Sequence, residues 1–364
     1  MKWGLIVLIS LCAGTSLCIE WKHAAIVCDA GSTGTRVYSF RTSDDGLNQV
    51  DMKLLGKITP GIAKYSINYQ LDEFVDKFTK LVSAAINTHG LDIPVIVLGT
   101  GGVRNLSENQ QLSLWKTFRQ NLIPKLPGYS GELKLEAIEG TAEAFYGLVS
   151  ANHIFESGIG VLDLGGSSVE IAHVGEDGIV GTSDDVLVTH AQLGTEKIRV
   201  TAAGFCDFGH TSNGGRCRTR IREIILEQNI NKLLLGNSHE FIAISAFVYS
   251  LDFGRWLLTF EEAPLFYDQY PRPSVNAVRE ACDAVCSKEL DVNLFQKHYL
   301  TNAVEATGRC FDICFVAELM TSFGLGEDER RVNFVKDLNG KEVEWTLGYY
   351  ITHILRYETS NEEL

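Results

Sequence analysis

Short apolar runs that end in an aspartate occur at two distant places in this chain. One run covers 24–28 and the other 160–162, and each leads through Asp29 or Asp163 into a turn rich in Gly, Ser and Thr. Each pattern predicts a buried strand that ends in Asp and continues into a tight hairpin turn. The second occurrence begins the same order of strand and turn again, which indicates an internal repeat of architecture.

The rest of the pattern alternates between strand and helix periods. Strands are expected over 24–28, 36–40, 52–57, 94–98, 136–138, 160–162, 169–174, 186–192 and 332–334. Helices are expected over 71–88, 107–121 with a Ser N-cap, 141–152, 221–230, 277–288 and 346–355. Alternating elements with two restarts predict an α/β protein of two similar lobes with a cleft between them.

The two turns, 29–36 and 163–168, carry the residue types that bind phosphate. Successive backbone N–H groups in such a turn point into one concavity, and Ser and Thr hydroxyls add donors. The Asp at each strand end can hold a hydrated divalent cation beside the phosphate. Two turns with this chemistry predict a fold whose halves clamp a phosphate chain and a metal between them.

Length and charge narrow the class of protein. The 364 residues suffice for two lobes with cores of their own. The apolar run from Leu5 to about Leu17 predicts a secretory signal peptide over 1–18, with a buried N-terminal strand as the alternative. A net charge of −14 argues against nucleic acid and anionic membranes as partners. We therefore expect an exported monomer, secreted or periplasmic, without a membrane anchor in the mature chain.

Cysteine spacing agrees with export. Seven cysteines follow the predicted signal peptide, and Cys28 is expected to be a buried free thiol in a core strand. Cys206 and Cys217 flank a Gly/Asn-rich stretch that is expected to be a loop, and they predict a local disulfide. Two C-x-x-x-C pairs place their thiols on one helix face each, so antiparallel helices would form Cys282–Cys314 and Cys286–Cys310. A four-thiolate zinc site is the alternative for these four.

Five motifs in order resemble those of the ecto-nucleoside triphosphate diphosphohydrolases, or apyrases, and they cover most of the chain. They are 29–36, Gly-Thr-Gly-Gly-Val-Arg at 99–104, Ile-Glu-Gly-Thr-Ala-Glu-Ala-Phe-Tyr-Gly at 138–147, 163–168 and Trp-Thr-Leu-Gly-Tyr at 345–349. The second motif more often reads Ala-Thr-Ala-Gly-Met-Arg in that family. The third usually has consecutive glutamates, and the fourth usually continues Thr-Gln where this chain has Val169-Glu170.

The last two departures resemble the exopolyphosphatase relatives, which share the first four motifs. Those relatives are typically cytoplasmic and lack the Trp-Thr-Leu-Gly element. The predicted export signal and Trp345 therefore favour apyrase. The resemblance implies the actin/hexokinase/Hsp70-like (RNase H-like) fold, with the active site in the interlobe cleft. It also implies that the C-terminal helix returns to the first lobe, which gives 19–138 plus 336–364 as lobe I and 139–335 as lobe II.

The resemblance also implies a role for individual residues. Glu143 is the expected general base, Ser168 helps to orient the attacking water, and Glu170 raises the pKa of Glu143 or serves as a second base. The expected phosphate ligands are Gly31, Ser32, Thr33, Gly34, Thr35, Arg36, Gly165, Gly166 and Ser167. Asp29 and Asp163 are expected to hold Mg²⁺ or Ca²⁺, with Thr100 and Trp345 lining the metal pocket. Tyr249 and Ala246 are expected to contact the nucleobase.

Several alternatives stay open from the sequence. Arg36 and Arg104 either position phosphates or tie the lobes together, and Trp345 and Tyr249 could be core residues. The leading function is a secreted hydrolase of nucleoside tri- and diphosphates. An exopolyphosphatase or guanosine pentaphosphate phosphatase is the second possibility, and a nucleotide-binding module without turnover is the third; Glu143 argues against the third.

Overall fold

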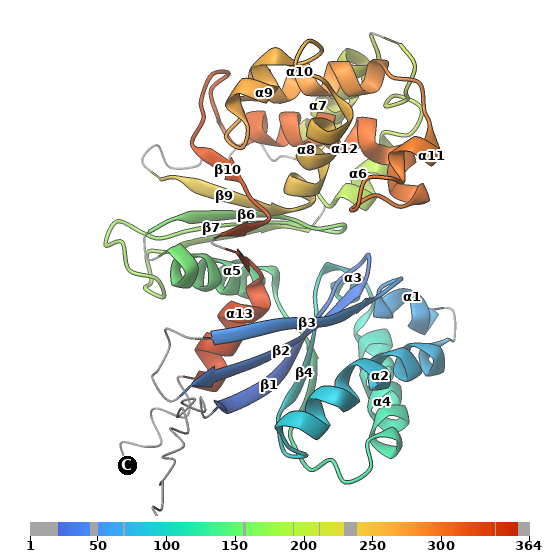
Figure 1. The fold of residues 1–364 in the computed structure, drawn as a ribbon, viewed down its shortest axis with the longest axis vertical. Coiled ribbons are helices and arrows are strands. Elements are labelled where there is room, and N and C mark those ends of the chain that lie inside the picture. The colour runs from blue at the N-terminus through green and yellow to red at the C-terminus, as the bar shows by residue number, and fades with distance from the viewer. Residues whose placement is uncertain are drawn as a thin grey trace, which may run out of the picture.

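The computed structural model describes residues 21–43, 50–67, 70–155, 158–191, 193–210, 212–228, 239–338 and 340–355. The expected signal peptide lies outside these residues. Two α/β lobes lie one above the other, and two helices lie between their sheets (Figure 1). This arrangement confirms the expected two-lobed, actin-like architecture.

The lobe I sheet has five strands in the order β3-β2-β1-β4-β5. Its strands are β1 (Trp21–Ala30), β2 (Thr35–Ser43), β3 (Val50–Ile58), β4 (Val95–Gly99) and β5 (Leu133–Ala137). β1, β2 and β3 form an antiparallel meander, whereas β4 and β5 run parallel to β1. β4 is buried along its whole length, as its uninterrupted apolar sequence predicts.

The lobe II sheet repeats this topology. Its order is β10-β9-β6-β7-β8, with an antiparallel β6-β7-β8 meander and β9 and β10 parallel to β6. Its strands are β6 (Gly160–Leu164), β7 (Val169–His173), β8 (Val186–His190), β9 (Phe241–Ser245) and β10 (Val332–Phe334). The restart of the plan at Gly160 is thus confirmed as a duplicated sheet.

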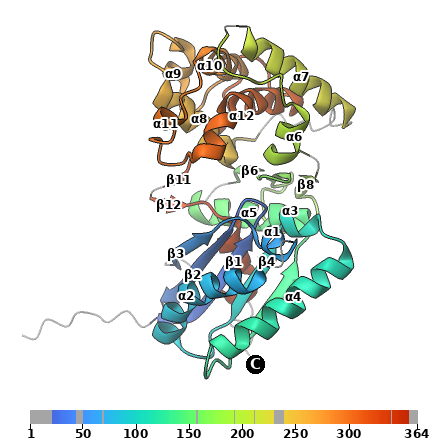
Figure 2. The ribbon, with the colours of Figure 1, turned by 90° about the vertical axis from the view of Figure 1, so that its right-hand side faces the viewer.

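Helices cover both sheets and fill the space between them (Figure 2). Lobe I carries α1 (Ile62–Ile67), α2 (Leu71–His89), α3 (Gly101–Arg104), α4 (Glu108–Leu122) and the short η1 (Ile123–Lys125). Ser107 caps α4 in a capping box with Gln110, as its position predicts. Between the sheets, α5 (Gly140–Phe155) packs on β6, β7 and β8. Against it lies α13 (Trp345–Tyr350), which continues as η2 (Ile351–Leu355) and also contacts β1 and β2.

The contact between α5 and α13 requires a glycine. A Cβ at Gly348 would lie 1.9 Å from the carbonyl oxygen of Tyr146, so no other residue fits there without moving a helix. This approach holds the Trp-Thr-Leu-Gly segment against α5. Tyr350 then stacks on Phe40 of β2, with ring centroids 5.0 Å apart. The C-terminal helix therefore packs against the lobe I sheet.

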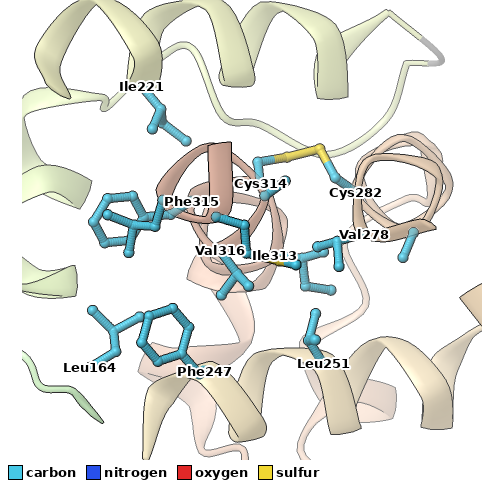
Figure 3. Close-up of a cluster of buried hydrophobic side chains, with 14 of the residues drawn as sticks. Leu164, Ile221, Phe247, Leu251, Val278, Cys282, Ile313, Cys314, Phe315 and Val316 are labelled. Atoms are coloured by element: carbon cyan, nitrogen blue, oxygen red, sulfur yellow. A yellow bond between two sulfur atoms is a disulfide. The ribbon is translucent and has the colours of Figure 1, made fainter. Parts of the chain in front are cut away.

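A helical cap completes lobe II. It contains α6 (Thr195–Thr201), α7 (Asn213–Glu227), α8 (Ala246–Leu257), α9 (Pro264–Gln269), α10 (Val275–Ser287), α11 (Val292–Phe295) and α12 (Ala303–Ser322). α12 runs through the middle of this cap, and every residue from Gly308 to Met320 is buried. Its apolar side chains point toward several neighbours at once, with Phe247 and Leu251 of α8 on one side and Ile221 of α7 on another (Figure 3).

The first turn of α7 corrects one expectation from the sequence. The Gly/Asn-rich stretch between Cys206 and Cys217 was expected to be a loop, yet α7 begins at Asn213 and includes Gly214. A Cβ at Gly214 would lie 2.1 Å from Oδ1 of Asp283. Close packing of α7 on α10 therefore explains this glycine better than chain flexibility does.

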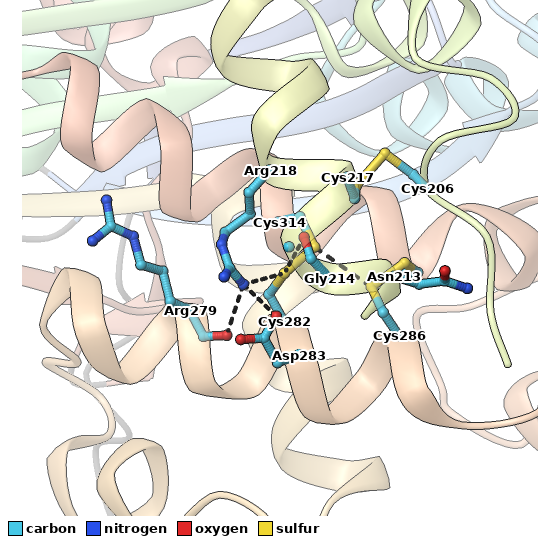
Figure 4. Close-up of a disulfide and its surroundings, with 12 residues drawn as sticks. Cys206, Asn213, Gly214, Cys217, Arg218, Arg279, Cys282, Asp283, Cys286 and Cys314 are labelled. Atoms are coloured by element: carbon cyan, nitrogen blue, oxygen red, sulfur yellow. Dashed lines mark hydrogen bonds and ion pairs between the residues drawn. A yellow bond between two sulfur atoms is a disulfide. The ribbon is translucent and has the colours of Figure 1, made fainter. Parts of the chain in front are cut away.

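The cap contains the three expected disulfides, Cys206–Cys217, Cys282–Cys314 and Cys286–Cys310. Two of them join α10 to α12, and Cys206–Cys217 joins α7 to the segment before it. Arg218 of α7 donates to Asp283 and to the carbonyl of Arg279 beside them (Figure 4). The zinc alternative is thereby contradicted, because these thiols are paired with one another. Among the described residues, Cys28 is a free and buried cysteine.

Removing one of these bridges should lower stability more than activity. The bridges Cys282–Cys314 and Cys286–Cys310 span 32 and 24 residues, which corresponds to about 3–4 kcal/mol each in the chain-entropy model. A Cys286→Ser/Cys310→Ser variant should melt about 5 °C or more below the wild type, with room-temperature activity retained. Calorimetry and peptide mapping test this. Mapping that finds these thiols free in the native protein would contradict it.

Candidate active site

The two phosphate-type turns have the same backbone geometry. In the first, the Gly31 N–H donates to the Gly34 carbonyl at 3.0 Å, and in the second the Gly165 N–H donates to the Ser168 carbonyl at 2.9 Å. Both are therefore four-residue hairpin turns that begin two positions after the aspartate. They face each other closely, because a Cβ at Gly166 would lie 2.5 Å from Oγ of Ser32.

A cavity of about 390 Å³ lies between the lobes at these turns. Most residues that the sequence assigns to the site line it, from both lobes. They are Asp29, Gly31, Ser32, Thr33, Arg36, Thr100, Glu143, Asp163, Gly165, Gly166, Ser167, Ser168, Ala246, Tyr249 and Trp345. The cleft therefore brings together side chains from five separate motifs.

Three residues of the expected site lie outside the cavity wall. Thr35 is fully buried in β2, and its Oγ1 has no hydrogen-bond partner among the described residues. Gly34 lies beneath the side chain of Lys57. Glu170 is buried behind Ser168. Gly34 and Thr35 thus do not line the cavity, and their expected role in phosphate binding stays a prediction.

The two strand-end aspartates differ in their partners. Asp29 accepts from Arg36 at 3.2 Å and from Thr100 Oγ1 at 3.4 Å, and burial raises its pKa. Burial also raises the pKa of Asp163 to about 6, although Ser245 donates to it. Ser245 has φ +57°, which is unusual for a residue with a side chain. This backbone conformation at the start of α8 accompanies the contact between its side chain and Asp163.

Arg104 connects the candidate base to Glu170. Its guanidinium donates to Glu143 Oε2 at 2.7 Å, to Glu170 Oε1 at 3.1 Å and to Ser168 Oγ at 3.1 Å. It also donates to the Ile138 carbonyl. Through Glu143 and Glu170, Arg104 joins lobe I to α5 and β7. Of the two roles open from the sequence, the structure shows Arg104 linking the lobes.

The two glutamates around Arg104 have raised pKa values. Burial, with the neighbouring Glu170 carboxylate, raises the pKa of Glu143 well above its usual range. Burial raises the pKa of Glu170 to about 7, with a smaller contribution from Asp163. Glu143 reaches the cavity and Glu170 does not. The raised pKa and the position on the cavity wall together make Glu143 a candidate general base.

Arg36 interacts with several neighbouring side chains. It pairs with Asp29, its charge is balanced further by Glu344, and the Tyr249 hydroxyl is within hydrogen-bond reach of it. Tyr249 is half-buried on the cavity wall, and Trp345 is 2% exposed and stacks on Tyr146. Both aromatic rings thus lie partly in the core and partly against the cavity.

Sequence reasoning missed several cavity residues. Glu344, Lys57 and Ser245 line the wall without belonging to the expected motifs. Burial raises the pKa of Glu344 to about 8. On the lobe II side, Arg199 and Arg309 both pair with Asp312 of α12. Glu344 could have been suspected because it precedes Trp345 in the sequence. Lys57 could have been found only from the strand register, which places it opposite Arg36.

The donor set around the turns suits a hard divalent cation. The carboxylates of Asp29, Glu143, Asp163, Glu170 and Glu344 gather there, and they outnumber the cations Arg36, Lys57 and Arg104 beside them. Asp29 and Asp163 reach the cavity from opposite lobes, and Thr100 adds a hydroxyl. Oxygen donors with excess negative charge are what Mg²⁺ and Ca²⁺ require. The residues present therefore fit such an ion.

Solved structures share this fold across nearly the whole chain. A nucleoside triphosphate hydrolase from Neospora caninum superposes with a TM-score of 0.63, at 13% identity over 93% of each chain. A Ppx/GppA family member from Aquifex aeolicus superposes with a TM-score of 0.58, also at 13% identity, over 93% of this chain and 99% of that one. At these identities the likeness shows the fold alone. In the part of the chain that the structure describes, no helix is both long and apolar enough to cross a membrane.

The sequence relatives are named as enzymes that act on nucleoside phosphates. The chain is 27% identical over 164 residues to the nucleoside-triphosphatase ntp-1 of Caenorhabditis elegans, covering 40% of this chain and 30% of that protein. It is 25% identical over 266 residues to human ectonucleoside triphosphate diphosphohydrolase 7, covering 58% and 42%. The matches thus span between about a third and two fifths of these relatives. A model of the GDA1/CD39 (nucleoside phosphatase) family matches residues 16–234 and 207–363, and the chain belongs to that family.

Proposed function

We propose that this protein is an exported apyrase, which hydrolyses nucleoside tri- and diphosphates to monophosphates and orthophosphate. The observation that carries the proposal is the pair of facing turns with Glu143 on the wall of the cavity between them. The family supplies the reaction class. The cavity supplies the parts that phosphoryl transfer to water needs: fixed phosphates, an aligned water and a base.

The terminal phosphate lies between the turns in this proposal. The N–H groups of Gly31 and Gly165 are used within the turns, so in this proposal the backbone N–H groups at Ser32, Thr33 and Gly166 and the hydroxyls of Ser32 and Ser167 donate to its oxygens. A divalent cation held by Asp29 and Asp163 would neutralise charge on the phosphate chain. In this proposal these groups fix the phosphorus atom, and the attacking water lies between it and Glu143.

Glu143 takes the proton of the attacking water. The water oxygen forms a bond to the terminal phosphorus, and the bond from phosphorus to the bridging oxygen breaks, so the nucleotide leaves with one phosphate fewer. Ser168 is held by Arg104 at 3.1 Å and orients the water. Arg104 is a positioning residue here, because it holds Glu143 at 2.7 Å without reaching the cavity itself.

Export is part of the proposal and has separate support. Three disulfides stabilise the lobe II cap, and disulfides persist in oxidising compartments. The apolar stretch before residue 18 has the length of a signal peptide. An exopolyphosphatase is the competing function, favoured by Glu170 in the fourth motif.

Glu143→Gln should abolish most turnover while leaving binding intact. Loss of a general base lowers kcat by about 10²- to 10⁴-fold, and the amide keeps the shape of the side chain. Glu108→Gln, a carboxylate change at the exposed start of α4, is the matched control. Phosphate release and the Kd for a non-hydrolysable triphosphate analogue measure the two effects. Turnover near that of the wild type would transfer the base role to Glu170.

Glu170→Gln should extend activity to lower pH. The Glu170 carboxylate raises the pKa of Glu143, and activity is lost as the pH falls through that pKa because the base becomes protonated. Removing the charge lowers the pKa of Glu143, so the acidic limb of kcat/KM should move down by about one pH unit. Glu176→Gln, in an exposed loop, is the control. An unmoved limb, or one that moves upward, would contradict the coupling.

The substrate class is tested with ATP, ADP, AMP and inorganic polyphosphate. Tri- and diphosphates should release phosphate with Mg²⁺ or Ca²⁺ and lose this activity in excess chelator. AMP should react poorly, because it offers one phosphate where two are gripped together. Asp29→Asn and Asp163→Asn should each weaken binding of the metal ion and lower turnover. Activity confined to polyphosphate would favour the competing function.

A further inference from the structure

Lys57 is a cation on the cavity wall for which the described residues provide no hydrogen-bond or ion-pair partner. It lies in β3 directly opposite Arg36 of β2 in the strand register. Two like charges in that relation repel each other. Arg36 is balanced by Asp29 and Glu344, but the structure shows no hydrogen bond or ion pair within reach of the Lys57 ammonium among the described residues.

The first phosphate turn is shaped around the Lys57 side chain. A Cβ at Gly34 would lie 2.7 Å from Cε of Lys57 and 3.0 Å from the carbonyl oxygen of Ile58. Gly34 does not have a positive φ, so the glycine is required there for space. The stem of Lys57 therefore passes over Gly34 of the turn, and the residue lines the cavity.

The residues that line the cavity differ in exposure. Glu143 is 8% exposed, whereas Lys57, Thr59 and Lys64 are exposed. In an in-line displacement the leaving group departs on the side opposite the attacking water. In the proposed function the water comes from the Glu143 side, so the leaving phosphate points away from Glu143, toward the exposed part of the cavity, whose wall includes Lys57.

We propose that Lys57 forms an anion subsite for the phosphate next to the cleaved one, on the leaving-group side. This inference rests on the proposed function and names a residue that positions its leaving group. Lys64 and Arg199 also line the cavity, but they pair with Glu196 and Asp312. Partial burial and the neighbouring Arg36 lower the pKa of Lys57, which agrees with a site that an anion completes.

The test compares Lys57→Met with Lys53→Met. Methionine keeps the apolar stem over Gly34 and removes the charge, and Lys53 is an exposed lysine of the same strand outside the cavity. With Mg²⁺ present, Lys57→Met should weaken binding of imidodiphosphate by about 10- to 100-fold. Binding of orthophosphate, which fills only the position between the turns, should change less than threefold. Lys53→Met should match the wild type, and Lys57→Arg should recover most of the imidodiphosphate affinity.

Two outcomes would overturn the proposal. One is wild-type affinity of Lys57→Met for imidodiphosphate, and the other is an equal loss for both ligands. If the variant does not fold, amine methylation of the wild type gives the answer: imidodiphosphate should protect Lys57 and orthophosphate should not. A wild type that neither hydrolyses nucleotides nor binds the analogue would refute the proposed function. An active wild type with an unaffected Lys57→Met would refute this inference alone.

Discussion

The close approach of two hairpin turns from different lobes is the constraint on which the rest of the site depends. A Cβ at Gly101 would lie 2.8 Å from Cβ of Ser167, and one at Gly102 would lie 2.6 Å from Cα of Ser32. The start of α3 therefore fills the space between the two turns without side chains. Gly101 stands where the family more often has Ala, and the contact with Ser167 explains why this chain uses the smaller residue. The turns can then grip one phosphate from two sides.

The fold was predictable because its signals are local. Buried strands ending in Asp, a Ser N-cap and helical cysteine spacing each report on a few neighbouring residues. For α12, the longest helix among the described residues, the cysteine spacing predicted a helix at Cys310 and Cys314, but its extent from Ala303 to Ser322 was not predicted, for a physical reason. It is buried on all sides from Gly308 to Met320, so its sequence lacks the apolar stripe that marks a half-exposed helix. Its charged residues are paired inside the lobe, as Arg309 is with Asp312 at 3.3 Å.

The site was predictable only as far as its motifs reach. Asp29, Glu143 and Asp163 follow from turns and motifs, and the structure brings them to one cavity. The position of Lys57 on the cavity wall depends on the strand register, and the role of Arg104 depends on which residues of the opposite lobe it contacts. Neither can be predicted from sequence spacing. The same limit applies to Thr35, which belongs to the first motif but points into the core. A motif therefore names the segment that matters without fixing which of its side chains reach the cavity.

The duplicated sheets also show how one architecture supports two different tasks. The register pairs Asp29 with Arg36 in lobe I and Asp163 with Glu170 in lobe II. The same position thus carries a cation in one half and a carboxylate in the other. In lobe I, Arg36 offsets the negative charge of Asp29. In lobe II, the negative charge of Glu170 is offset by Arg104 from the opposite lobe. Since Arg104 also holds Glu143, the geometry of the candidate base depends on how the lobes are held together. A single guanidinium thus links the candidate base to the contact between the lobes.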